Sequence, residues 1–300
     1  MRISDLTLSA SLGGELQADQ QALAALDGEI SSGLAIQQPS DDPVGAVQVL
    51  ADRRQIAQLA AYQSTAQAAS SWLGLAGQTV TAVLDSLQTA RTVVLQALSS
   101  GSQTTQSYQA YAEQLSGTLQ TLVGLANTTY GETPIFAGTA GVAAAYSPTG
   151  AYNGNSTPFT MQVGPGTTVA VSVPGTSLFG GGPTGVQDLF TTLGNLVADL
   201  SKGPGPAAEA GLTNDLAALD ANISLAEQAS TTIGESSRMV SSAESANTAA
   251  STQLQGALGT LEDANLGVLG PQFQADLTAY QAALAAASQT LPETLAAFLK

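Results

Sequence analysis

Few side chains in this sequence could do chemistry, and the two most versatile types are missing. The 300-residue chain contains no cysteine and no histidine. Zinc sites made of those residues are therefore excluded, and so is nucleophilic machinery of the Ser-His-Asp or Cys-His kind. Disulfide bonds are excluded as well, so packing or assembly must stabilise the protein.

The adjacent acids Asp41 and Asp42 are the only acidic pair in a predicted loop, which runs from Gln37 to Pro43. A calcium or magnesium site would need further oxygen ligands at defined positions, and no other acids have the spacing of a calcium loop. Asp42 precedes a proline, as an N-cap residue does when proline takes the first helical position. We therefore expect turn and capping roles here, and no metal.

The remaining polar clusters also favour structural roles. The glycine-rich runs 164–166 and 180–182 lack the lysine that a phosphate-binding loop requires. Glu262 and Asp263 lie in a predicted helix, where we expect a solvated face. With no catalytic constellation in the sequence, we expect neither an enzyme nor a cofactor.

The few basic residues suggest ion pairs, and the single tryptophan suggests packing. Arg53 and Arg54 stand beside Asp52, so a surface ion pair is the default interpretation. Arg91, inside an apolar stripe, and the isolated Arg238 could pair within the chain or between subunits. For Trp72 we expect core or helix-junction packing.

The charge balance limits the possible partners. Seven basic and 23 acidic residues give 7 − 23 = −16 at neutral pH. Such a chain lacks the clustered Lys and Arg that bind nucleic acid, and anionic membrane surfaces would repel it. No apolar run is long enough to span a bilayer, and residues 1–30 do not resemble a cleaved signal peptide. These observations indicate a cytoplasmic protein, unless export uses a route without a cleaved signal.

The composition predicts helical flanks around a turn-rich middle. Residues 133–187 contain no charged side chain, and 131–206 hold 8 of the 12 prolines and 15 of the 31 glycines. We predict a mainly α protein with a β-rich insert, in which both termini form an elongated antiparallel helical bundle. The expected parts are 1–130 and 207–300 for the helical assembly domain and 131–206 for a small outer β-containing domain.

Apolar residues recur at helical spacing near both termini. The first stripe steps by 4-7-3-4, and the last shows a near-heptad spacing typical of helices that pack along one another. Each stripe needs an apolar partner, and the simplest is the other terminus. We predict an assembly interface made of Leu12, Leu16, Leu23, Leu26, Ile30, Phe273, Leu277, Tyr280, Leu284, Leu291, Leu295 and Phe298.

Local signals predict where the elements begin and end. The first helix should end at Ser31–Gly33, and later helices should cover about 43–99, 104–129, 186–200 and 207–268. We expect an interruption near Gly74 and Gly77 and a kink or a fresh start at Pro292. Alternating apolar residues from 159 to 163 and from 169 to 173 predict a β-hairpin around Gly164-Pro165-Gly166.

Several motifs, in order along nearly the whole chain, resemble those of the flagellin and hook-associated protein 3 family. The string from Ile30 to Pro43 and the opening Met1–Ser4 resemble the N-terminal signature of bacterial flagellins. The other motifs resemble the hook–filament junction members and the shared terminal helix. They are Tyr130–Glu132, Ile135–Thr139, Tyr152–Gly154, Val163-Gly164, Val169–Gly175, Leu261–Ala264, Tyr280–Leu284 and Leu295–Leu299.

The resemblance implies a structural role in the bacterial flagellum. Family members leave the cell unfolded through the flagellar type III apparatus without a cleaved signal, so an extracellular location is expected. Their terminal helices form a coiled-coil-like inner domain. The implied partners are flagellin, the preceding hook-associated protein, copies of the chain itself and an export chaperone, with no nucleic acid and no membrane.

Two members of the family and one outside class remain open. The motifs Phe136–Thr139 and Val173–Gly175 favour a hook–filament junction adapter. A flagellin-type filament subunit is the alternative. A cytoplasmic helical scaffold or export chaperone is the third interpretation, which a purely cytosolic location would support.

Overall fold

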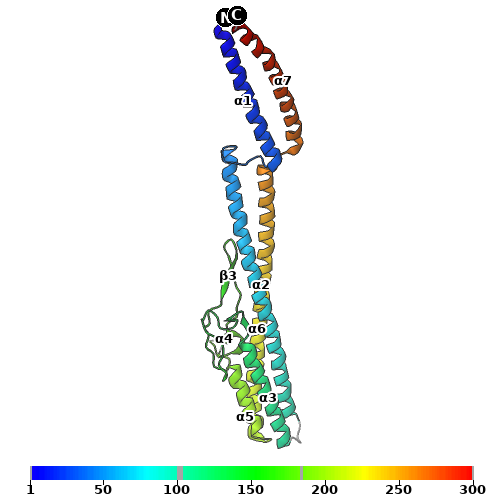
Figure 1. Cartoon of the computed structure of the whole chain (residues 1–300). Helices are drawn as coiled ribbons and strands as arrows, with labels where there is room; N and C mark the ends of the chain where they lie inside the picture. The colour runs from blue at the N-terminus through cyan, green and yellow to red at the C-terminus, as the bar shows by residue number, and fades with distance from the viewer. Residues whose placement is uncertain (1, 100–103, 183–184, 299–300) are drawn as a thin grey trace. The chain divides into compact units, whose positions relative to one another are not determined.

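The computed structural model describes residues 2–99, 104–182 and 185–298, with side chains from residue 11 to residue 288 within these ranges. The chain forms two compact units. Unit 1 contains Met1–Gln58 and Ala250–Lys300, and unit 2 contains Leu59–Ala249. The elements in chain order are α1 Arg2–Ser32, α2 Pro43–Leu98, α3 Thr105–Ala126, β1 Thr129–Tyr130, β2 Thr133–Pro134, β3 Thr160–Gly164, β4 Thr167–Ala170, α4 Gly175–Phe179, α5 Leu189–Ser201, α6 Pro206–Glu262 and α7 Leu266–Phe298 (Figure 1). Helices α2 and α6 contribute residues to both units.

In unit 1, α1 and α7 lie side by side and antiparallel, as the sequence predicts (Figure 1). Helix α1 ends at Ser32, because Gly33 takes the left-handed backbone conformation with a φ of 71°. Helix α7 does not start afresh at Pro292 but continues to Phe298. A proline inside a helix removes one backbone hydrogen bond, and α7 remains helical on both sides of it.

In unit 2, long stretches of α2 and α6 pack with α3 and α5 around an apolar core. Leucines from several helices are fully buried there, among them Leu87, Leu115, Leu122, Leu193 and Leu196. Helix α2 runs through Gly74 and Gly77, so the predicted interruption is wrong. Each glycine costs about 1 kcal/mol in a helix, and burial of α2 side chains on either side of them outweighs that cost.

The middle of the chain forms the predicted hairpin and more loop than strand. Strands β3 and β4 pair antiparallel, with Met161 opposite Val169. Gly166 in the connecting turn has a φ of 70°, which suits glycine. A second two-residue pair, β1 with β2, joins Tyr130 to Thr133. Helix α5 packs against α3 and so belongs to the helical core of unit 2.

Aromatic rings attach the hairpin and its loops to the helices. Trp72 is buried, as predicted, with its ring centroid 5.2 Å from that of Tyr130 and 5.6 Å from that of Phe159. The Tyr146 ring lies edge-on to Phe179 and tilted against Phe190, and burial raises the pKa of its hydroxyl. On the other side, buried Asn247 of α6 donates from Nδ2 to the Val163 carbonyl at 2.7 Å. The hairpin is thus fixed to α2 and to α6.

Within the described residues, no helix combines the length and the apolar character that a membrane crossing requires.

Candidate assembly interface

The apolar stripe of α1 is only partly covered. Leu26 is buried, with 8% of its surface exposed, whereas Leu12, Leu16, Leu23 and Ile30 are half-buried. A stripe that packs in a complete core would place all five side chains out of reach of water. Helix α1 therefore keeps apolar surface that the single chain does not bury.

The stripe of α7 is covered even less. Phe273, Leu277 and Tyr280 are half-buried, and 43% of Leu284 is exposed. Gln20 of α1 donates from Nε2 to the Tyr280 hydroxyl at 2.8 Å, which places the two stripes beside one another. The side chains of three further predicted interface residues lie outside the described residues: Leu291, Leu295 and Phe298.

The segments that leave α1 and α6 are joined by backbone hydrogen bonds. The Ala35 amide donates to the Glu262 carbonyl at 2.7 Å, and the Ala264 amide donates to the Gly33 carbonyl at 2.9 Å. Leu34 and Asp263 form an isolated antiparallel bridge between these contacts. We call residues 33–35 and 262–264 the crossing. The crossing holds the end of α1 close to the segment that leads into α7.

One ion pair supports the crossing. Arg53 of α2 donates from Nη2 to Oε1 of Glu262, whose side chain is only 7% exposed. The predicted solvated position of Glu262 is therefore wrong, because this carboxylate faces α2 rather than water. The predicted neighbour Asp52 is buried and instead accepts a hydrogen bond from Gln48 Nε2 at 2.8 Å.

The loop from Gln37 to Pro43 has the turn and capping geometry that the sequence predicts. Asp41 Oδ2 accepts from the backbone amides of Gln37 and Gln38 at 3.0 and 2.9 Å, and Asp42 Oδ1 accepts from the Val44 amide at 3.1 Å. The hydrogen bond from the Gln38 backbone lowers the pKa of Asp41 below its usual value. The described residues contain no group of three acidic side chains that could hold a metal ion.

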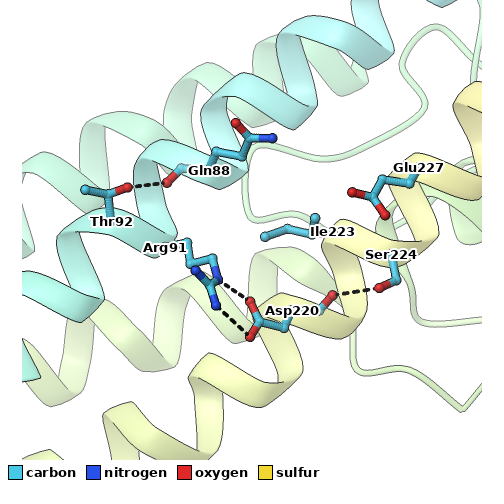
Figure 2. A pocket seen from close by; sticks show the side chains of 7 residues that line it. All are labelled: Gln88, Arg91, Thr92, Asp220, Ile223, Ser224 and Glu227. Carbon is cyan, nitrogen blue, oxygen red and sulfur yellow. Dashed lines mark hydrogen bonds and ion pairs between the residues drawn. The ribbon is translucent and has the colours of Figure 1, made fainter.

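In unit 2, Arg91 makes the intramolecular pair, one of the two alternatives that the sequence leaves open. Its Nε donates to Asp220 Oδ1 at 2.6 Å, between α2 and α6 (Figure 2). Both side chains are close to half exposed, in an open polar groove that also includes Glu227. Arg238 is exposed and has no ion-pair partner among the described side chains. The groove shows no constellation for catalysis.

Replacing Arg53 by glutamine should loosen the crossing, because the buried Glu262 carboxylate would lose its charged partner. We expect a loss of about 1–3 kcal/mol for opening the crossing. Hydrogen exchange at the Ala35 and Ala264 amides measures that opening. The matched control is Arg91→Gln, which breaks an exposed pair worth about 0–1 kcal/mol. Unchanged exchange in Arg53→Gln would contradict the role given to this pair.

Comparison with known proteins finds one family model that matches part of the chain. The family model for the bacterial flagellin N-terminal helical region matches residues 3–140. The match covers α1 from its second residue and extends through α2, α3, β1 and β2. A search among curated proteins finds none that matches the chain.

Many solved structures match the fold, among them proteins of Vibrio, Legionella and Xanthomonas. A Vibrio parahaemolyticus protein assigned as flagellar hook-associated has a TM-score of 0.68 and 22% identity, over 74% of this chain and 100% of its own. The flagellar junction protein FlgL of Legionella pneumophila has a TM-score of 0.59 and 17% identity, and the match covers 72% of this chain and 99% of that protein. FlgL of Xanthomonas campestris has a TM-score of 0.54 and 19% identity, and the match covers 70% of this chain and 97% of that protein.

The resemblance indicated by the sequence motifs is confirmed by these matches. Residues 3–140 match the N-terminal helical region of bacterial flagellin, and the chain has the mainly helical fold, with small antiparallel sheets, of the flagellar hook-associated proteins.

Proposed function

We propose that this protein is a structural subunit of the bacterial flagellum and acts as the adapter between hook and filament. One observation carries the proposal: the apolar stripes of α1 and α7 remain half-covered, on a fold shared with a flagellar junction protein. Half-covered stripes on helices are a surface for other helices.

The geometry supports assembly through the terminal helices. In a single chain, α1 and α7 cover only one side of each other. When neighbouring copies add helices to the open side, the stripes become buried in a coiled-coil-like array. The interface residues are those predicted from the sequence, from Leu12 to Ile30 and from Phe273 to Phe298. A net charge of −16 keeps separate subunits apart at low salt before assembly.

The proposed partners follow from this position. The subunit contacts copies of itself, the preceding hook-associated protein on one side and flagellin on the other, and an export chaperone before secretion. It reaches the cell exterior through the flagellar export apparatus without a cleaved signal peptide. A chain without cysteine suits that route, because it cannot form disulfide crosslinks on the way.

A flagellin-type filament subunit is the second candidate. The match of residues 3–140 to the N-terminal region of flagellin favours it. Deletion of the gene separates the two candidates. The adapter should leave hooks without filaments and with flagellin shed into the medium, whereas a filament subunit should leave no shed flagellin. Normal filaments on the deletion strain would contradict both candidates.

Leu284→Glu should prevent incorporation of the protein into flagella. The substitution places a charge in the exposed part of the α7 stripe, which the proposed assembly buries. We expect at least a tenfold reduction in the amount of the protein in purified flagella, with unchanged synthesis, measured by quantitative immunoblotting. Gln281→Glu is the matched control, because it adds the same charge at an exposed α7 position outside the stripe. Normal incorporation of Leu284→Glu would count against the proposed interface.

A further inference from the structure

The first turns of α2 are apolar on two opposite faces. Ala46 and Val49 are buried. Val44 and Val47 are 82% and 68% exposed. At 100° per residue the exposed valines lie on the side of the helix opposite Val49. A helix that is apolar on opposite sides normally has a partner on each of them.

The exposed face continues to an arginine that has no partner. Val44, Val47, Leu50 and Arg54 follow one another at spacings of three, three and four residues, which places them on one face of α2. Arg53, Arg91 and Lys202 each form an ion pair, but Arg54 is exposed and has none among the described side chains. We call Val44, Val47, Leu50 and Arg54 the docking stripe.

A second exposed surface has the complementary chemistry. Around the connection between α6 and α7, Leu261, Leu266 and Val268 are 38%, 54% and 58% exposed. Asp263 lies between them in the sequence, is exposed, and forms no ion pair within the described part of the chain. We call Leu261, Asp263, Leu266 and Val268 the connection surface. It presents three apolar side chains and one carboxylate, where the docking stripe presents three apolar side chains and one guanidinium.

We propose that the docking stripe of one copy binds the connection surface of a second copy. The apolar side chains bury one another, and Arg54 of one copy pairs with Asp263 of the next. The proposal rests on the proposed function, which requires copies to contact one another, and it names a contact separate from the α1 and α7 stripes. When the two surfaces of one copy meet two different neighbours, the contact is head to tail and extends into a ring or a helical array.

The absence of cysteine in the natural sequence makes a direct test possible. Cells express two full-length variants together, Val47→Cys and Val268→Cys, and a short bismaleimide crosslinker is added to intact cells. We expect a dimer at twice the mass of the chain only when both variants are present. Leu50→Cys serves as a second stripe variant in case Val47→Cys fails to assemble. Gln255→Cys, an exposed α6 position outside both surfaces, replaces the stripe variant as the control.

Exchanging the charges of Arg54 and Asp263 tests their proposed ion pair independently of the crosslink. Arg54→Asp alone should reduce the protein in purified flagella at least tenfold, and the double variant Arg54→Asp, Asp263→Arg should restore most of it. Arg238→Asp makes the same charge change at an exposed, unpaired arginine of unit 2 and should have no such effect.

Three results would overturn the proposed contact: no crosslinked dimer, a stripe variant crosslinked to a different protein, or no recovery in the double variant. The cellular location of the chain is recorded in the same samples. Cysteine variants found in flagella without the crosslink contradict only the docking contact, whereas absence of the unsubstituted chain from flagella contradicts the proposed function.

Discussion

Burial of narrow apolar stripes on long helices is the interaction on which this structure depends. The sequence has no cysteine, and only 10% of its residues are charged. Among the described side chains there are three ion pairs: Arg91–Asp220 is half exposed, and the other two each join an exposed cation to a buried carboxylate. Most of the stabilising free energy must therefore come from Ala, Leu and Val side chains whose apolar surface is removed from water when helices pack. Unit 2 achieves this burial within one chain, but unit 1 does so only in part.

This difference between the units links the fold to the proposed function. In unit 2, α2, α3, α5 and α6 bury leucines completely, and the hairpin is fixed by Trp72 and Asn247. In unit 1, Leu26 is the one buried member of the α1 stripe. The crossing joins the segments that leave α1 and α6 by backbone hydrogen bonds, and the Arg53–Glu262 pair joins α2 to α6 there. An element with few buried contacts is the natural one to become ordered on assembly.

Signals confined to a few neighbouring residues could be interpreted from the sequence. Gly33 ends α1, Asp42 and Pro43 begin α2, and Gly164-Pro165-Gly166 turns the hairpin, because each depends only on local backbone geometry. Features that depend on distant contacts were not predictable. Gly74, Gly77 and Pro292 stay helical in their tertiary setting, and Glu262 is buried because Arg53, 209 residues away in sequence, faces it.

The candidate assembly interface was predictable only in part, because its spacing is a local signal whereas its burial depends on contacts between distant residues. Spacing reveals stripes, but it does not show which stripes a single chain leaves uncovered, such as Leu284. Sequence reasoning missed the docking stripe. Its signal was present, since Val44 and Val47 lie opposite Val49 on one helix, but only burial in the folded chain shows which face remains open.

Hydrogen exchange of the purified subunit and of assembled flagella tests the central claim, that the terminal helices complete their burial only on assembly. The account predicts that the backbone amides of α1 and α7 exchange rapidly in the free subunit and slowly after assembly, while those of α3 and α5 are protected in both. Equal and strong protection of α1 and α7 in the free subunit would contradict it.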